Sequence, residues 1–464
     1  MHAQEVTKSS LASIAQGLRT GEIRSADILG HSIACHAKSE SRLGAYRTWC
    51  GDRAQRQAIA IDQLIATNID LGPLMGIPVS VKDLYGVPGL PTFAGTDAEL
   101  SSDWEQAGPL INALQSQLGV VVGKTHTVEF AFGGLGTNPH SGTPVNPWSQ
   151  IDAPRAPGGS SAGAGVSLAQ GTALLALGTD TAGSVRIPAA YTGQCALKIT
   201  HGRWPLDGIV PLSPSLDTPG LLARSIADLA FAFASLDPHA KAITTACDLS
   251  TLRIGIIENT VWEDIEPSID DNTRKALISI EKAGSKLHPV TLPCTENVLE
   301  IFRAGGLAAP ELRAFMDSNF PERIARLDPT VMARVQAADG ITAADYLQRA
   351  ANLKHFGQLA SVAFNEVDVL VSPTIPITAP LLSDLSNPDT YRRANMLALR
   401  NTALVNLFGW CAVTLPTGLD SEGIPTGLQL IAPPMQEERL LAVAQSFERT
   451  IGTSLEALGP APLS

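Results

Sequence analysis

Two stretches decide how this chain is interpreted, Pro157-Gly-Gly-Ser-Ser-Ala-Gly-Ala-Gly165 and Gly183-Ser184-Val-Arg-Ile-Pro188. Eight glycines lie between positions 158 and 193, where the chain average of 40 in 464 would place about three. The charged residues of that span are Asp180 and Arg186 alone. Small apolar residues dominate positions 162–177, so the sequence predicts a helix buried deep in the core.

The composition favours one large compact body. Charged residues make up 17% of the 464 positions, against about 25% in an average soluble protein. Hydrophobic residues make up 44%, which excludes a disordered chain. The net charge of −12 disfavours nucleic-acid binding through bulk charge, because phosphate is repelled.

The cysteine spacing and the length of the apolar runs indicate where in the cell the protein is expected. The six cysteines include no CxxC pair, so a disulfide scaffold or a zinc ribbon is not expected. The N-terminus lacks the apolar region of a signal peptide, and no run approaches 18 apolar residues. We therefore expect a cytoplasmic protein without a membrane span.

Helical and strand-like segments alternate along the chain. Helices are expected in residues 9–66, 110–118, 272–283 and 296–360, and strands at 76–83, 119–123, 252–257, 290–292, 367–371 and 412–415. This alternation predicts an α/β fold: a single large domain whose central mixed β-sheet is flanked by helices on both faces. Within 1–464 we expect N-terminal helices (1–66), a catalytic core (67–235), a variable, partly helical region (240–360) and a return to the core sheet (361–445).

Three familiar motifs fit poorly. Residues 119–125 resemble a phosphate-binding loop, but only three residues separate the glycines where four are needed. The GxSxG pattern of residues 159–163 would make Ser161 a nucleophile, yet Pro154 and Pro157 precede it where a central strand is required. The nine histidines are scattered and form no metal or triad pattern.

After these motifs are set aside, the remaining candidates for a catalytic site are Lys82 and the glycine- and serine-containing segment that ends at Ser184. Lys82 ends an apolar strand; standing alone it is typical of a surface lysine, whereas burial would lower its pKa and let it act as a neutral base. The small residues from Gly178 to Ser184 can turn several backbone N–H groups toward one point, which suits an oxyanion. The alternative for Ser184 is a helix cap.

Together these pieces resemble the amidase signature family. The resemblance runs from about residue 10 to 445, is weakest between 240 and 360, and rests on motifs at 76–83, 157–165, 183–193, 196–203, 216–225 and 427–434. Two departures are visible, because Ala182 and Ala162 stand where the family usually has glycine or serine.

The resemblance implies roles for single residues. Ser184 would be the nucleophile, and Ser160, after a cis peptide bond from Gly159, would relay its proton to Lys82. Backbone N–H groups of Thr181, Ala182, Gly183 and Ser184 would form the oxyanion hole. Structural support is expected from an Asp180–Arg186 pair and from the Ser161 hydroxyl at a helix start.

The implied activity is hydrolysis of a carboxylic amide through an acyl-enzyme, with esters, carbamates and ureas as further substrates. No cofactor and no metal are expected. The partner would be a small-molecule amide or carbamate, with no nucleic acid and no membrane; whether the chain forms a homodimer stays open. The alternatives are the glutamine-splitting component of a tRNA-dependent amidotransferase and a binding module without activity.

The substrate pocket is expected to include Ala131, Phe132 and Gly133, although Phe132 is equally typical of core. Residues 296–360 and the loop after Val371 would shape the remaining walls. The glycines of residues 133–136 suggest room for a bulky or aromatic group, and no arginine marks a carboxylate-bearing substrate.

Overall fold

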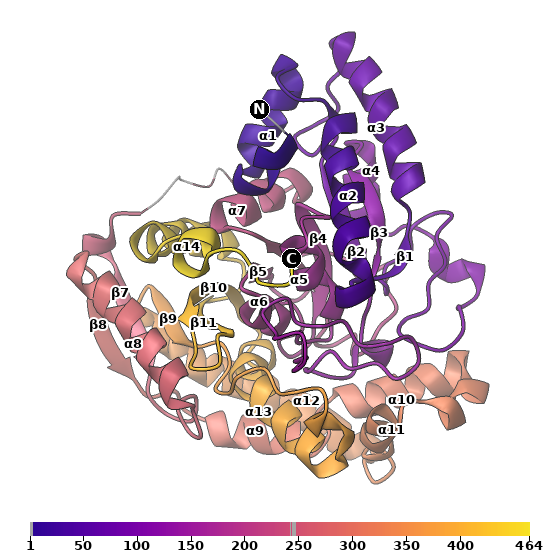
Figure 1. Ribbon diagram of the computed structural model, residues 1–464. Helices are drawn as coiled ribbons and strands as arrows, with labels where there is room; N and C mark the ends of the chain where they lie inside the picture. Colours follow the sequence, from indigo (N-terminus) through magenta and orange to yellow (C-terminus); the bar gives the residue numbers. More distant parts are fainter. Residues whose placement is uncertain (1–2, 242, 244–246) are drawn as a thin grey trace.

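The computed structural model describes residues 3–241, 243 and 247–464. In this part of the chain, eleven strands form one mixed sheet in the order β1-β3-β2-β4-β6-β5-β10-β11-β9-β7-β8 (Figure 1). The strands are β1 (Tyr46–Trp49), β2 (Pro78–Lys82), β3 (Val120–Thr125), β4 (Leu175–Asp180), β5 (Cys195–Lys198), β6 (Thr218–Ala223), β7 (Arg253–Ile257), β8 (Lys286–Val290), β9 (Val369–Pro373), β10 (Cys411–Leu419) and β11 (Pro425–Ala432).

Helices occupy both faces of the sheet, and a group of them extends beyond its edge. They are α1 (Leu11–Thr20), α2 (Ser25–Leu43), α3 (Gly51–Ala66), α4 (Pro109–Ser116), α5 (Ala162–Ala169), α6 (Arg186–Thr192), α7 (Ile226–Leu236), α8 (Pro267–Lys282), α9 (Thr295–Arg303), α10 (Ala308–Asn319), α11 (Pro329–Gln336), α12 (Ala343–Ala360), α13 (Pro388–Leu407), α14 (Glu437–Ile451) and α15 (Ser454–Leu458).

Short 3-10 helices lie in several connections. They are η1 (Ala3–Lys8), η2 (Ser102–Glu105), η3 (Glu129–Ala131), η4 (Leu249–Thr251), η5 (Pro321–Arg326), η6 (Ser361–Asn365) and η7 (Asp384–Ser386).

The predicted fold class is confirmed. Helices α7, α14 and α8 pack in succession against strands from β6 to β9, and α5 and α6 pack against the strands from β2 to β11. Strands β2, β3 and β4 are buried along their whole length, as expected for parallel neighbours covered on both sides. Helices α9 to α13 lie together at the lower side of Figure 1.

Two predicted segments differ from the structure. The helix expected over 162–177 ends at Ala169, and residues from Leu175 onward form the central strand β4. Gly171, with φ +74°, turns the chain between them, a conformation that glycine adopts readily. The segment 9–66 is not wholly helical, because Tyr46–Trp49 form the edge strand β1 beside β3.

Some strands were misplaced or missed. Strand β8 covers Lys286–Val290 rather than 290–292, and β5, β6 and β11 were not predicted. The division of the chain into four segments stays a prediction. Among the described residues, no helix has the length and apolar character that crossing a membrane requires.

Candidate active site

The site is centred on two neighbouring parallel strands, β2 and β4. Lys82 ends β2 and is fully buried; its Nζ donates hydrogen bonds to Ser160 Oγ (2.7 Å) and to Thr179 Oγ1 on β4 (2.8 Å). The Gly159–Ser160 peptide bond is cis, as the resemblance implies. The surface alternative for Lys82 is therefore wrong, because the side chain ends inside the core.

Burial sets the charge state of Lys82. Loss of hydration lowers its pKa to about 7, while the carboxylates of Asp217 and Asp180 oppose the shift. A lysine with a pKa near neutrality is partly uncharged at physiological pH. It can therefore accept a proton there, which an ordinary surface lysine cannot do.

Ser184 lies in the turn between β4 and α6 and lines the cavity described below. Its carbonyl oxygen accepts a hydrogen bond from the backbone N–H of Ser161 (3.2 Å). No hydrogen bond joins the hydroxyls of Ser160 and Ser184 in the described structure, so only the Lys82–Ser160 contact of the expected relay is formed. Contacts of this kind commonly tighten when substrate binds.

Asp180 and Arg186 form a fully buried ion pair, with Nη2 3.0 Å from Oδ1. Burial opposes the ionisation of Asp180, but Arg186, Lys198 and Asn406 outweigh it and hold the pKa of Asp180 at about 2. The carboxylate also accepts backbone N–H groups from Gly183 (2.7 Å) and Val185 (3.2 Å). Asp180 thus braces the turn that carries Ser184.

The expected oxyanion hole needs one correction. The N–H of Gly183 donates to Asp180, so it is not free to bind an oxyanion. Thr181, Ala182 and Ser184 line the cavity, and their backbone N–H groups have no acceptor among the described residues. Backbone N–H groups without an acceptor, in residues that line a cavity, are available to a developing negative charge.

Ser161 lies at the start of α5, where the prediction placed its hydroxyl. Its hydroxyl makes no capping bond to α5, and it donates instead to the carbonyl oxygen of Thr179 (3.3 Å). Ser161 therefore ties the start of α5 to β4, beside the lysine. Thr179 itself is a contact of Lys82 that sequence reasoning missed.

Asp217 is a second residue that was missed. Its Oδ1 accepts the hydroxyl of Thr181 (2.5 Å), and its Oδ2 accepts the N–H groups of Leu212 and Ser213 (both 2.9 Å). Burial raises its pKa to about 6, against the opposing effect of these hydrogen bonds and of Lys82. The sequence did point to Asp217, because this residue lies in the motif at 216–225, but no role was assigned to that motif.

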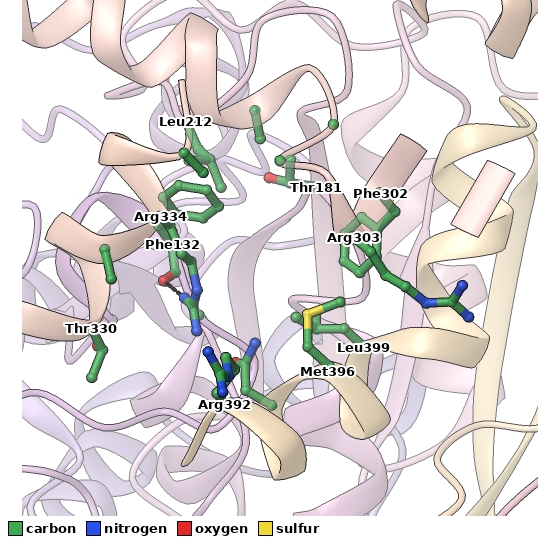
Figure 2. Close-up of a pocket in the computed structure, with 18 of the residues that line it drawn as sticks. Phe132, Thr181, Leu212, Phe302, Arg303, Thr330, Arg334, Arg392, Met396 and Leu399 are labelled. Carbon is green, nitrogen blue, oxygen red and sulfur yellow. Dashed lines mark hydrogen bonds between the residues drawn. The ribbon is translucent and has the colours of Figure 1, made fainter. Parts of the chain in front are cut away.

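A cavity of about 510 Å³ opens in front of Ser184. Ala131, Phe132 and Gly133 line one side of it, and the rest comes mainly from α9, α10, α11 and α13 (Figure 2). Region 296–360 thus shapes the cavity as expected. The loop directly after Val371 does not, since that wall is formed by Pro388 to Leu407 of α13.

Two of the three glycines in residues 133–136, Gly134 and Gly136, lie where the chain packs closely. A Cβ on Gly134 would lie 2.9 Å from Leu399, and one on Gly136 would lie 2.4 Å from the carbonyl oxygen of Gly158. Gly133 lines the cavity, and room for a bulky or aromatic group stays a prediction.

The sequence singled out no arginine near the substrate pocket, but the structure places arginines there. Three arginines line the cavity, Arg303, Arg334 and Arg392, with Asp389 as the one acidic residue in the described lining. Figure 2 shows Arg334 beside Phe132 and Arg303 on another wall. In the described part of the chain, no group of three His, Cys, Asp or Glu residues is arranged to hold a metal ion.

Comparison with known proteins identifies relatives that match nearly the whole length of the chain. A family model described as Amidase matches residues 27–441. The chain is 53% identical to the 2-amino-5-chloromuconic acid deaminase of Comamonas testosteroni, covering 97% of this chain and 98% of that protein. It is 30% identical to an amidase of Pseudomonas putida, covering 96% of each protein. A crystal structure of an amidase matches with a TM-score of 0.87 and 26% identity, covering 96% of this chain and 100% of that one.

Proposed function

The chain belongs to the amidase signature family, and from this premise we propose that it hydrolyses a C–N bond of a small substrate, with Ser184 as nucleophile. The observation that carries the proposal is the buried Lys82, whose pKa is lowered to about 7 and whose Nζ lies 2.7 Å from Ser160 Oγ. A buried lysine hydrogen-bonded to hydroxyls rather than to a carboxylate is suited to moving protons.

The proposed steps follow for a carboxylic amide. Neutral Lys82 accepts the proton of Ser184 through Ser160, and Ser184 Oγ attacks the carbonyl carbon. The N–H groups of Thr181, Ala182 and Ser184 bind the resulting oxyanion. The C–N bond then breaks, the proton returns to the leaving nitrogen, and water hydrolyses the acyl-enzyme by the same relay.

The relative at 53% identity gives the first substrate to assay, a 2-aminomuconic acid. This is a six-carbon diene diacid with an amino group on carbon 2. Conjugation with the distant carboxyl group makes carbon 2 electrophilic, so addition of an oxygen nucleophile and loss of nitrogen parallel the amide reaction. Overall, water replaces the amino group by a hydroxyl and ammonia leaves. We place this substrate class ahead of simple amides, esters, carbamates and ureas.

The glutamine-splitting component of a tRNA-dependent amidotransferase is the second candidate. Identity to a glutamyl-tRNA(Gln) amidotransferase chain of Synechococcus sp. (strain RCC307) is 31%, well below the 53% to the deaminase, and both alignments cover nearly the whole chain. The higher identity favours an enzyme that completes the reaction on a small molecule without a partner protein. Catalytic turnover of glutamine by the purified chain, without turnover of aminomuconate, would favour the amidotransferase component instead.

Ammonia release tests the proposal. The purified chain is incubated with 2-amino-5-chloromuconate, with aryl and aliphatic amides and with glutamine, and ammonia is measured by a coupled assay. We expect turnover of at least one substrate and its loss in Ser184→Ala. Undiminished release by a folded Ser184→Ala variant would contradict the proposal.

A further inference from the structure

Two polar residues stand one turn apart on α11 and both line the cavity, Thr330 and Arg334. Residues four apart lie on the same face of a helix, so both side chains project from one strip of α11. Neither was singled out by its sequence pattern. Their contacts set them apart from the other polar residues of the cavity.

Arg334 has no carboxylate partner within the described structure. Its Nη1 donates to the carbonyl oxygen of Phe132 and its Nη2 to the hydroxyl of Tyr391 (3.3 Å). The guanidinium carbon lies 5.4 Å from the Phe132 ring centre and 5.5 Å from that of Tyr391. A guanidinium has five N–H donors, of which these contacts use two. The two other arginines of the cavity are already paired, Arg303 with Glu296 and Arg392 with Asp389.

Thr330 contributes a buried hydroxyl without a partner. Its Oγ1 is shielded from solvent, yet it makes no hydrogen bond with any described residue. A buried polar group without a partner is unfavourable, and in native proteins it usually finds one. Because this oxygen is shielded, it lies behind the surface of the cavity, and the group of α11 that a ligand can reach is the guanidinium of Arg334; a guanidinium without a carboxylate partner in a cavity wall points to an oxygen-bearing anion as its ligand.

The position of Arg334 is tied to the catalytic segment. The loop from Val128 to Gly136 donates from Val128 N to the carbonyl oxygen of Ser160 (3.1 Å) and accepts from Gly159 N at Gly134 O (2.8 Å). The same loop accepts the Arg334 hydrogen bond at Phe132 (Figure 2). A group bound by Arg334 is thus held at a fixed place relative to Ser160.

The charge of the cavity favours the same kind of ligand. The whole chain carries −12, but in the described lining of the cavity Arg303 and Arg392 are paired with carboxylates, which leaves Arg334 as an uncompensated positive charge. A positive cavity in an acidic protein attracts anions locally while the rest of the surface repels them.

We propose that Arg334 forms a carboxylate-binding subsite, which makes carboxylate-bearing molecules the preferred substrates. Arg334 pairs with the carboxylate through the unused donors of its fork. This subsite rests on the proposed function, because it selects the substrate of that hydrolysis.

Equilibrium binding tests the subsite without requiring turnover. Muconate, which has two carboxylates and no C–N bond, and 2,4-hexadien-1-ol, an uncharged diene of the same carbon number, are titrated into the wild-type chain by calorimetry. We expect muconate binding to weaken about 10- to 100-fold in Arg334→Met and less than about twofold in Thr330→Val, because the Thr330 hydroxyl is shielded from the cavity. Arg334→Lys should restore part of the loss, and hexadienol binding should change less than about twofold.

A charge-matched control distinguishes a direct contact between Arg334 and the ligand from the general electrostatic effect of removing one positive charge. Arg303→Met removes the same charge from a guanidinium already paired with Glu296, so it should weaken muconate binding less than about threefold. Absence of muconate binding to the wild type, or equal muconate affinity in Arg334→Met, would overturn the proposal. Equal weakening of both ligands in Arg334→Met would also overturn it, because that pattern indicates a structural role. The catalytic proposal is judged separately, by ammonia release in Ser184→Ala.

Discussion

Two parts of the molecule differ in how their polar side chains are paired. One is the buried layer behind Ser184 (Lys82, Ser160, Thr179, Asp180 and Arg186), called the floor here, and the other is the outer wall of the cavity, which carries Arg334 on α11. On the floor, Lys82 is hydrogen-bonded to Ser160 and Thr179, and Arg186 is paired with Asp180, all inside the core. On the wall, Arg334 lacks a carboxylate partner among the described residues. The buried charged side chains of the floor have their partners within the chain, which suits a fixed catalytic arrangement. The guanidinium of the wall lacks a carboxylate partner, which suits selection of the ligand.

Ser184→Ala gives the largest expected effect, and it acts on the floor alone. Loss of the nucleophile should lower kcat by on the order of 10⁴-fold or more, because the remaining groups act only around it. Muconate affinity should stay within about twofold, since the carboxylate subsite is intact. Ammonia release and calorimetry on the same preparation measure both. A large loss of binding would mean that floor and wall are not separate.

Lys82→Met should lower kcat by about 10²- to 10⁴-fold, the usual contribution of a general acid–base. In the wild type the base form is neutral lysine, so the rate should rise with pH through about 7 and level off above it. This rising limb should be absent from the residual activity of the variant. A pH–rate profile of both proteins checks it; an unchanged limb in Lys82→Met would assign the titration to another group.

Arg186→Met tests whether the floor depends on its buried ion pair. The change leaves the Asp180 carboxylate buried without its cationic partner, which should cost about 3 to 5 kcal/mol of unfolding free energy. The matched control is Arg392→Met, whose pair with Asp389 is exposed and should contribute less than about 1 kcal/mol. Urea unfolding of the three proteins gives the values. If Arg186→Met and Arg392→Met had similar unfolding free energies, the buried ion pair would contribute no more to stability than the exposed one, contrary to this prediction.

Asp217→Asn gives the smallest expected effect, which is a shift of the rising limb of the pH–rate profile. The Asp217 carboxylate raises the pKa of Lys82, so its removal should move the rising limb of the rate to lower pH. Asn keeps an oxygen for the N–H groups of Leu212 and Ser213. Asp389→Asn, at the rim of the cavity, should leave the limb in place. A limb at unchanged or higher pH in Asp217→Asn would contradict the account.

Much of the floor could be predicted because its signals are local. The motifs around Ser160 and Ser184 lie within one short span, and the Asp180–Arg186 pair is six residues apart. Where prediction failed there, periodicity was the reason. A buried helix and a buried strand are both apolar all round, so residues 175–177, the first half of β4, were interpreted as the end of a helix.

The wall could not be predicted because its contacts join distant parts of the chain. Arg334 meets the carbonyl oxygen of Phe132 across 202 positions, and its partner ring Tyr391 lies a further 57 positions along. On the sequence, Arg334 is one of many arginines in a polar helical region. Only the folded chain shows that it enters the cavity while Arg303 and Arg392 are paired with carboxylates.

Covalent labelling of the nucleophile tests the central claim most directly, and it needs no knowledge of the substrate. A fluorophosphonate reacts with an activated serine hydroxyl and expels fluoride, and peptide mass spectrometry locates the adduct. The account predicts labelling of Ser184, at a rate that rises with pH through about 7 and falls steeply in Lys82→Met. A label on another residue, or labelling of Ser184 at the wild-type rate in folded Lys82→Met, would contradict it.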